Sequence, residues 1–395
     1  MRILIATQTY SNGNGQASFV IRLAENLARI GHQVMVVTPS ERGRADSATV
    51  NGVQVEKVTS LHMSILHPAI YLSLPSARTI RRIFDQFQPE IVHIQDHYFV
   101  SQGVLREALR RGIPAVGTNH FLPQNILPFL RKLPKLQDLI ARPLWAMMLA
   151  VFNRLDVATA PSETAVEILR EQKIRVPTYA ISNGVDVQRF HPDPNVDRMG
   201  VRRKYSIAPD RSIFLYVGRI DGEKRLDVLL QAASRLKRDY FQVAIVGFGL
   251  QEEALRQQAR SLGLNGHVTF VGYVPPEDLP ALYNSADVFV MPSPEELQSI
   301  ATLEALACGK PVLAADARAL PELVQPGVNG YLFRPVDSAS TAEVMAKMLD
   351  CHEQWKSMGR LGAESVQRHS LERSIQSYEQ LYRSVLEKKS KRKTE

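Results

Sequence analysis

Residues 213–236, IFLYVGRIDGEKRLDVLLQAASRL, decide the fold class of this 395-residue chain. The apolar run Ile213–Val217 predicts a buried strand, and the apolar spacing of Leu226–Leu236 predicts a helix. A strand that passes through a short loop into a helix is the repeating unit of a parallel sheet covered by helices. The stretch therefore predicts an α/β fold.

The same alternation recurs on both sides of this stretch. Short apolar runs predict strands at Ile3–Ala6, Gln33–Val37, Ile91–Ile94, Ala115–Thr118, Val157–Ala160, Tyr179–Ile181, Gln242–Val246, His267–Phe270, Val288–Met291 and Pro311–Ala314. A turn cluster at Ser182–Asp186 separates the two sets of strands. We expect two doubly wound, Rossmann-like domains, 1–186 and 187–370, facing a central cleft, followed by a C-terminal helix and basic tail over 371–395.

Composition excludes several classes of protein. Hydrophobic residues make up 45% and charged residues 22%, which is ordinary globular composition and excludes a disordered or collagen-like chain. Two cysteines exclude a disulfide framework and a cysteine-built metal site. Met1–Thr7 is too briefly apolar for a signal peptide, and no apolar run approaches the roughly 20 residues of a membrane span. We expect a cytoplasmic protein.

The net charge of 48 − 40 = +8 is concentrated in the first half. Residues 1–186 carry 20 basic and 14 acidic side chains, and residues 187–395 carry 28 and 26, five of the 28 in Lys388–Lys393. This distribution fits an anionic partner surface such as a membrane, and it fits general solubility equally well. Nothing in the sequence indicates a nucleic-acid partner.

Charged and glycine-rich loops follow the predicted strands, where ligands bind in such sheets. Arg219 and Lys224 follow Ile213–Val217 and suit the oxygens of a diphosphate, unless they form a solvated basic loop. The turns at Ser11–Ser18 and Val246–Leu250 can present N–H groups to an anion. Neither fits the dinucleotide fingerprint G-x-G-x-x-G, which disfavours a nicotinamide enzyme, and each also fits a plain tight turn.

Two carboxylates follow the predicted strand Val288–Met291. Glu296 precedes the next helix and Glu304 lies within its early turns, so both suit the hydroxyl groups of a sugar. The structural alternatives are a helix N-terminal charge for Glu296 and an exposed helical residue for Glu304.

Together these residues make the chain resemble the retaining glycosyltransferases of family 4, which have the GT-B fold. The resemblance covers almost the whole length and rests on Gly13-x-Gly15, Asn183–Asp186, Val217–Arg219 with Lys224, Val246-Gly247-x-Gly249, Phe270–Val274, and Glu296 with Glu304–Val312. It implies a C-terminal helix that packs back on the first domain, and a reaction without a cofactor. It implies no metal, and no metal-ligand spacing stands out.

The resemblance also assigns roles to single residues. The catalytic set is His120, Glu296, Arg219 and Lys224; the donor-binding set is Gly15, Gly247, Phe270, Val271, Leu297, Gln298, Ser299, Ile300 and Glu304. In this assignment Arg219 and Lys224 bind the donor diphosphate and Glu304 binds the ribose. Glu296 contacts the donor sugar, and the strand end at Phe270–Val274 meets the nucleobase. His120 matches the histidine that the family places in the cleft, although a lone histidine is usually structural.

The chain departs from the family pattern at two places. Glu296-Leu297-Gln298-Ser299 replaces the common Glu-Gly-Phe-Gly, so the two glycines that would let the backbone approach the sugar closely are absent from this motif. Its glutamine is similar to the Glu-Thr-Gln-Gly of bacterial glucosyl-diacylglycerol synthases. Arg225 follows Lys224 where glycine is common, and either adds a phosphate contact or faces solvent.

These observations predict a hexosyltransferase that uses a nucleoside-diphosphate sugar, UDP-glucose in the leading interpretation, and a membrane lipid such as diacylglycerol. Two segments suit an anionic interface, Leu61–Leu74 leading to Arg78, Arg81 and Arg82, and Leu127–Arg142 with Arg131, Lys132 and Lys135. The enzyme would then be peripheral on the inner face of the cell membrane. The alternatives are a soluble or polysaccharide acceptor, a UDP-sugar 2-epimerase, and a binding protein without catalysis.

Overall fold

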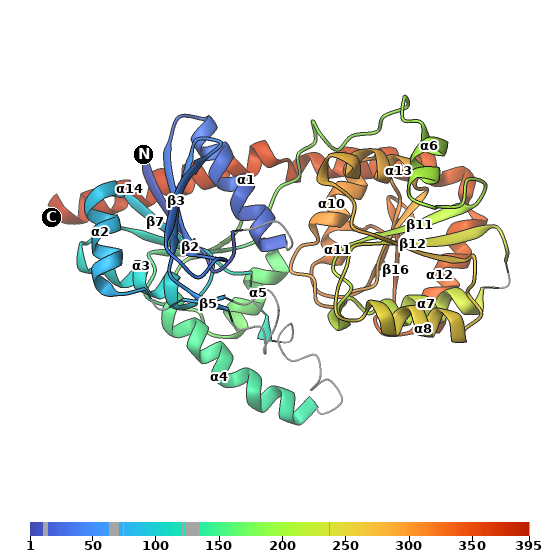
Figure 1. Cartoon of the computed structure of the whole chain (residues 1–395), viewed down its shortest axis with the longest axis horizontal. Helices are drawn as coiled ribbons and strands as arrows, with labels where there is room; N and C mark the ends of the chain where they lie inside the picture. The colour runs from blue at the N-terminus through green and yellow to red at the C-terminus, as the bar shows by residue number, and fades with distance from the viewer. Residues whose placement is uncertain are drawn as a thin grey trace. The chain divides into compact units, whose positions relative to one another are not determined.

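The computed structural model describes residues 1–10, 15–62, 71–73, 75–120, 122–123, 134–236 and 238–394, with the backbone alone at 134–139 and 392–394. The chain forms two compact units. Unit 1 comprises Met1–Ser182 and Ser374–Glu395, and unit 2 comprises Asn183–Arg373. The end of the chain thus returns to the unit in which it began (Figure 1).

Unit 1 contains an eight-stranded sheet of order β10-β9-β8-β7-β1-β2-β4-β3, parallel except for the β3–β4 pair. The strands are β1 Arg2–Ala6, β2 Gln33–Pro39, β3 Asp46–Val50, β4 Val53–Val58, β7 Ile91–Ile94, β8 Ala115–Thr118, β9 Val157–Ala160 and β10 Thr178–Ala180, and a separate pair is formed by β5 Leu61–His62 and β6 Tyr71–Leu72. The helices are α1 Gly15–Arg29, α2 Ala77–Phe87, α3 Phe99–Arg110, α4 Pro134–Phe152 and α5 Glu163–Glu171. Strands β7, β8 and β9 are buried throughout, as expected for parallel strands covered on both faces.

Unit 2 contains a six-stranded parallel sheet of order β13-β12-β11-β14-β15-β16. Its strands are β11 Ser212–Val217, β12 Phe241–Val246, β13 Val268–Gly272, β14 Val288–Met291, β15 Val312–Ala315 and β16 Gly330–Phe333. Its helices are α6 Arg198–Lys204, α7 Leu226–Arg235, α8 Glu252–Ser261, α9 Leu279–Ser285, α10 Ile300–Ala307, α11 Leu320–Leu323, α12 Ser338–Asp350 and α13 Trp355–Ser365, with short 3₁₀ turns η3 Gly222–Lys224, η4 Pro276–Asp278, η5 His352–Gln354 and η6 Val366–His369. The prediction of two doubly wound α/β domains is confirmed.

Each sheet has a point where the strand order reverses. In unit 2, β12 and β13 lie on one side of β11, and β14 lies on the other; in unit 1, β2 and β7 flank β1 in the same way. Ligands of doubly wound sheets bind outside the carboxyl ends of the strands at such a switch point. The loops after β11 and β14, and those after β1 and β7, are therefore the places to look for a site.

The C-terminal helix α14, Leu371–Thr394, connects the two units. Its first residue is tied to unit 2, where the Leu371 N–H donates to the Val185 carbonyl oxygen at 2.8 Å. Further along, the Tyr382 hydroxyl lies 2.7 Å from Nδ1 of His93 on β7, and both side chains are fully buried. The expectation that this helix packs back on the first domain is confirmed.

The structure adds strands that the sequence analysis did not predict, namely β3, β4 and β16 in the two sheets. Strands β3 and β4 form a hairpin whose turn residues Asn51 and Gly52 have φ angles of 49° and 80°. No helix in the described part of the chain is long and apolar enough to cross a membrane.

Candidate functional site

The predicted site residues of unit 2 gather at the carboxyl edge of its sheet. Strand β11 leads into Arg219 and Lys224, β12 leads into Gly247, and β14 leads into the loop that carries Glu296. Phe270 and Val271 lie in β13 itself. Since β13, β12, β11 and β14 are consecutive neighbours in one parallel sheet, their carboxyl ends meet along one edge.

The turns after β11 and β12 are packed backbone against backbone. The Gly218 N–H donates to the Val246 oxygen at 3.0 Å, and the Ile220 N–H donates to the Phe248 oxygen at 2.9 Å. Gly247 has a φ of +125°, and a Cβ atom there would lie 1.9 Å from the Gly218 carbonyl oxygen. Glycine at 247 is therefore required for this close approach.

Lys224 and Glu296 form the central ion pair of this edge. The Nζ of Lys224 lies 2.6 Å from Oε1 of Glu296, and the two side chains are only 17% and 11% exposed. The pair joins the loops on either side of the switch point. Two residues that the sequence analysis assigned to separate motifs are thus in direct contact.

Arg219 is held by two carboxylates of its own loop. Its Nη1 lies 2.6 Å from Oδ2 of Asp221, and its Nη2 lies 2.5 Å from Oε1 of Glu223. The guanidinium carries five N–H donors and the Lys224 ammonium carries three, so these contacts leave donors on both cations for a phosphate. The two contacts thereby orient the Arg219 guanidinium without occupying all of its N–H donors.

Arg225 lies in the left-handed region, with φ 53° and ψ 37°, which explains why glycine is common at this position. Its guanidinium pairs with Asp227 at 2.8 Å. The Arg225 side chain is therefore already paired with a carboxylate, and at 20% exposure it does not simply face solvent.

Helix α10 begins where the sequence lacks the usual glycines. Ser299 caps the helix, because its Oγ accepts a hydrogen bond from the Thr302 N–H at 3.2 Å. The Gln298 Oε1 accepts from the backbone N–H of Asn183 at 2.7 Å, so this side chain holds the turn cluster at the start of unit 2. Leu297 is buried and Ile300 is partly buried.

Glu304 is buried rather than exposed, at 5% exposure, and its Oε2 accepts from the Tyr283 hydroxyl at 3.1 Å. The interpretation of Glu304 as an exposed helical residue is therefore wrong. Phe270 and Val271 are half-buried, and the guanidinium of Arg256 lies 4.6 Å from the centre of the Phe270 ring.

His120 and Gly15 belong to unit 1. Gly15 is the exposed first residue of α1, whereas Gly13 lies outside the described residues. His120 follows β8, its Nε2 lies 3.1 Å from Oε1 of Gln95, and its ring packs 5.1 Å from that of Phe19. Burial lowers the pKa of His120 to about 3, so the imidazole is neutral at pH 7.

The sequence analysis missed the polar residues that follow β7. Asp96 accepts from the Gln8 N–H at 2.5 Å and from the Ser101 hydroxyl at 2.7 Å, which fastens the loop after β1 to the loop after β7. Gln95 contacts His120 as described above. Their position directly after the predicted strand Ile91–Ile94 was the available signal.

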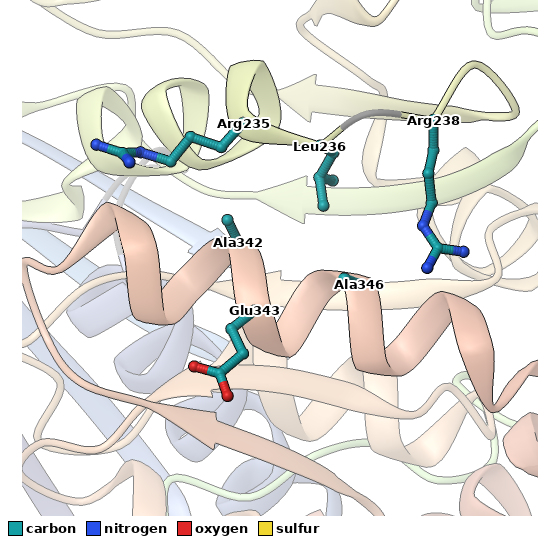
Figure 2. A pocket seen from close by; sticks show the side chains of 6 residues that line it. All are labelled: Arg235, Leu236, Arg238, Ala342, Glu343 and Ala346. Atoms are coloured by element: carbon teal, nitrogen blue, oxygen red, sulfur yellow. The ribbon is translucent and has the colours of Figure 1, made fainter.

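A shallow hollow of unit 2 lies elsewhere, between α7 and α12 (Figure 2). Leu236 and Ala342 point toward each other within it, and Arg235, Arg238 and Glu343 lie around it. None of the predicted site residues lines it. Within the described residues, no group of three His, Cys, Asp or Glu side chains is placed to hold a metal ion.

Comparisons with known proteins match both units. A family model described as "Glycosyltransferase Family 4" matches residues 13–189, and one described as "Glycosyl transferases group 1" matches residues 197–365. A GDP-mannose-dependent alpha-mannosyltransferase of Mycolicibacterium smegmatis is 31% identical over 337 residues, covering 84% of each chain. An alpha-monoglucosyldiacylglycerol synthase of Streptococcus pneumoniae is 25% identical and covers 84% of this chain and 75% of that protein.

Solved structures share the fold. The Anabaena protein HepE, in a crystal structure with UDP-glucose, superimposes with a TM-score of 0.77 over 97% of this chain and 99% of that one, at 20% identity.

Proposed function

The chain belongs to glycosyltransferase family 4, and we propose that it transfers a hexose from a nucleoside-diphosphate sugar to a lipid acceptor with retention of configuration. It is a glycosyltransferase with the GT-B fold. The observation that carries the finer proposal is the Lys224–Glu296 pair at the switch point of unit 2, where a cation for the leaving diphosphate touches a carboxylate for the sugar.

Six of the predicted residues have a physical role in this proposal. Arg219 and Lys224 bind the diphosphate and stabilise the negative charge that develops on it, together with the N-terminus of α10. Glu296 accepts hydrogen bonds from the sugar, and Glu304, with Tyr283 behind it, accepts from the ribose. His120 and Gly15 contribute from unit 1, which would bind the acceptor.

The proposed reaction exchanges one bond for another on the same face of the sugar. The bond between the anomeric carbon and the β-phosphate oxygen breaks, and the glycosidic bond to the acceptor oxygen forms. The acceptor's proton moves to the departing phosphate oxygen, so no protein carboxylate needs to attack. Glu296 and His120 position the reacting groups and stabilise the transition state.

UDP-glucose is our leading donor, because Glu296-Leu297-Gln298 is similar to the motif of glucosyl-diacylglycerol synthases, one of which is among the relatives. GDP-mannose is the second candidate, because the Mycolicibacterium relative with 31% identity is named for that donor. In the structure Gln298 already binds the Asn183 backbone, so its contribution to donor choice is indirect.

The test offers radiolabelled UDP-glucose and GDP-mannose separately to the purified chain, first with liposomes containing diacylglycerol and then with soluble sugars. We expect label in the lipid fraction from UDP-glucose. Label from GDP-mannose alone supports the second donor, and transfer only to soluble sugars overturns the lipid acceptor.

We predict that turnover persists in EDTA. Arg219 and Lys224 supply the positive charge that a divalent ion provides in other transferases. The measurement compares initial rates with EDTA, with EDTA followed by excess Mg²⁺, and without either. A complete loss of turnover that Mg²⁺ restores would contradict this prediction.

We predict that the protein binds anionic liposomes and that salt weakens this binding. On α2 the apolar residues Ile80, Ile83 and Phe84 are buried. Arg81 and Arg82 pair with Glu107 and Glu56, and both arginines are still exposed by more than half. The first half of α4 extends away from the sheet (Figure 1). Outside the described part of the chain lie residues 63–70, 74 and 124–133, and the last of these ranges includes Arg131 and Lys132. Each basic residue near an anionic surface contributes about 1 kcal/mol, and 1 M salt shortens the Debye length to about 3 Å.

Neutralising Arg131, Lys132 and Lys135 should reduce sedimentation with anionic liposomes and leave UDP-sugar affinity unchanged. A chain ending at Glu387 separates the contribution of the basic tail. Neutralising three exposed basic residues of unit 2, Arg334, Lys356 and Arg360, is the matched control. A protein that ignores anionic liposomes at low salt and glycosylates a soluble acceptor well refutes the membrane proposal.

A further inference from the structure

A buried chain of polar groups in unit 1 leads from the C-terminal helix to His120. The Tyr382 hydroxyl of α14 lies 2.7 Å from Nδ1 of His93, and the Thr118 hydroxyl lies 2.7 Å from its Nε2. The Gln95 amide nitrogen lies 3.1 and 3.2 Å from the two ring nitrogens of His93. The Gln95 Oε1 lies 3.1 Å from Nε2 of His120.

The last contact fixes the protonation of His120. An amide oxygen can only accept a hydrogen bond, so Nε2 of His120 must carry the hydrogen. Since burial lowers the pKa of His120 to about 3, the ring holds a single hydrogen at neutral pH. Nδ1 is then the unprotonated nitrogen and can accept a hydrogen bond.

The other hydrogen bonds around His93 explain why the Gln95 oxygen, and not its nitrogen, faces His120. Both ring nitrogens of His93 already have a hydroxyl partner, which fixes the ring plane. The Gln95 amide nitrogen is nearly equidistant from them and therefore lies over the ring face, whose negative charge suits an N–H group. The amide oxygen then points the other way, toward His120.

Burial alone accounts for the lowered pKa of His120, and no charged side chain of the described part of unit 1 contributes to it. Phe19 of α1 packs against its ring, Gln95 is neutral, and His93 lies beyond Gln95. Burial lowers the pKa of His93 to about 3, so His93 is also neutral. Among the described residues, Gln95 is the one hydrogen-bond partner of the His120 ring, so it sets the tautomer.

We propose that Gln95 is a positioning residue that holds His120 in the Nε2–H tautomer, so that Nδ1 accepts a hydrogen bond from a substrate hydroxyl. Tyr382 of the C-terminal helix holds Gln95 in place through His93. The substrate contact rests on the proposed function, whereas the tautomer does not. The C-terminal helix thereby becomes part of the apparatus that orients the candidate catalytic imidazole.

The test is ¹⁵N NMR of the histidine side chains in the full-length protein, with His120→Ala identifying the His120 signals. We expect the Nε2–H tautomer in the unsubstituted protein, and no titration between pH 5 and 8. An Nδ1–H tautomer in that protein overturns the proposal without any further variant.

Substitutions at Gln95 and Tyr382 then test the individual hydrogen bonds between the C-terminal helix and His120. Gln95→Glu places a carboxylate against the Nε2–H group and should raise the His120 pKa by about 1–3 units, adding an acid limb to the kcat profile. Gln95→Leu and Tyr382→Phe should each give a mixture of tautomers and lower kcat more than they raise the donor KM. Gln33→Glu, at an exposed position of β2, introduces the same charge and should change neither the His120 ¹⁵N signals nor the pH profile of kcat.

Two kinds of failure can be told apart. If Gln95→Leu and Tyr382→Phe fold but leave His120 in a single, unchanged tautomer, the positioning role is overturned whatever the activity. If the tautomer shifts as expected but His120→Ala retains full turnover, the substrate contact and the assignment of His120 in the proposed function fail, while the tautomer control stands.

Discussion

Replacing Lys224 with alanine is expected to lower kcat at least about 100-fold, and replacing Glu296 with alanine should do the same. Each residue offers the reacting groups a fixed charge, and the 2.6 Å contact between them holds both charges in place. Truncating either one therefore removes a substrate contact and the support of the other. Removing both should cost little more than removing one, because groups that act as a unit are not additive.

The experiment must separate catalysis from stability. Removing one partner of a buried ion pair commonly lowers the free energy of unfolding by about 3–5 kcal/mol. The kcat of each variant is therefore measured below its thermal unfolding midpoint. Glu296→Gln keeps the shape of the side chain and is the more informative substitution. Glu364→Ala breaks the exposed pair with Arg360, whose side chains are 58% and 63% exposed, and should leave turnover unchanged. Full activity in a folded Lys224→Ala or Glu296→Ala variant would reject the site assignment.

Local patterns in the sequence were sufficient for most of the parallel strands of both sheets, but not for β4 and β16, which pair in parallel with β2 and β15. Runs such as Ile91–Ile94 and Val288–Met291 are short, apolar and bounded by polar turns, and they are strands with those bounds in the structure. The β3–β4 hairpin was missed because β3 is exposed at all five positions and lacks the alternation of a half-buried strand. The Asn51-Gly52 turn was a usable signal, since both residues adopt positive φ.

Contacts between distant residues were beyond the sequence. Lys224 and Glu296 are 72 positions apart, and each motif was identified alone; only the strand order places β11 beside β14 and brings the two loops together. Tyr382 is 289 positions from His93, and its hydroxyl is one of several polar groups on an otherwise ordinary helix. A linear pattern indicates which residues follow strands, but it does not reveal which side chains share a hydrogen bond.

Replacing Gly247 with alanine is expected to lower kcat/KM for the donor at least about 100-fold and to destabilise unit 2. The added Cβ would lie 1.9 Å from the Gly218 carbonyl oxygen, which is far inside any van der Waals contact and involves a backbone atom that cannot rotate away. The φ of +125° adds backbone strain of its own. The turn after β11 must therefore move, and it carries Arg219.

A displacement of about 1 Å at a positioning group can cost about 100-fold in rate, which sets the size of the expected loss. Gly263→Ala is the matched control, because Gly263 also has a positive φ, +69°, but a Cβ there meets no atom within 4 Å. That variant should lose only the strain of a left-handed residue, about 1–2 kcal/mol, and keep the donor affinity of the unsubstituted enzyme. Denaturant unfolding and donor titration of both variants provide the measurement. If Gly247→Ala binds and turns over the donor as well as Gly263→Ala does, the contact between the two turns does not position Arg219.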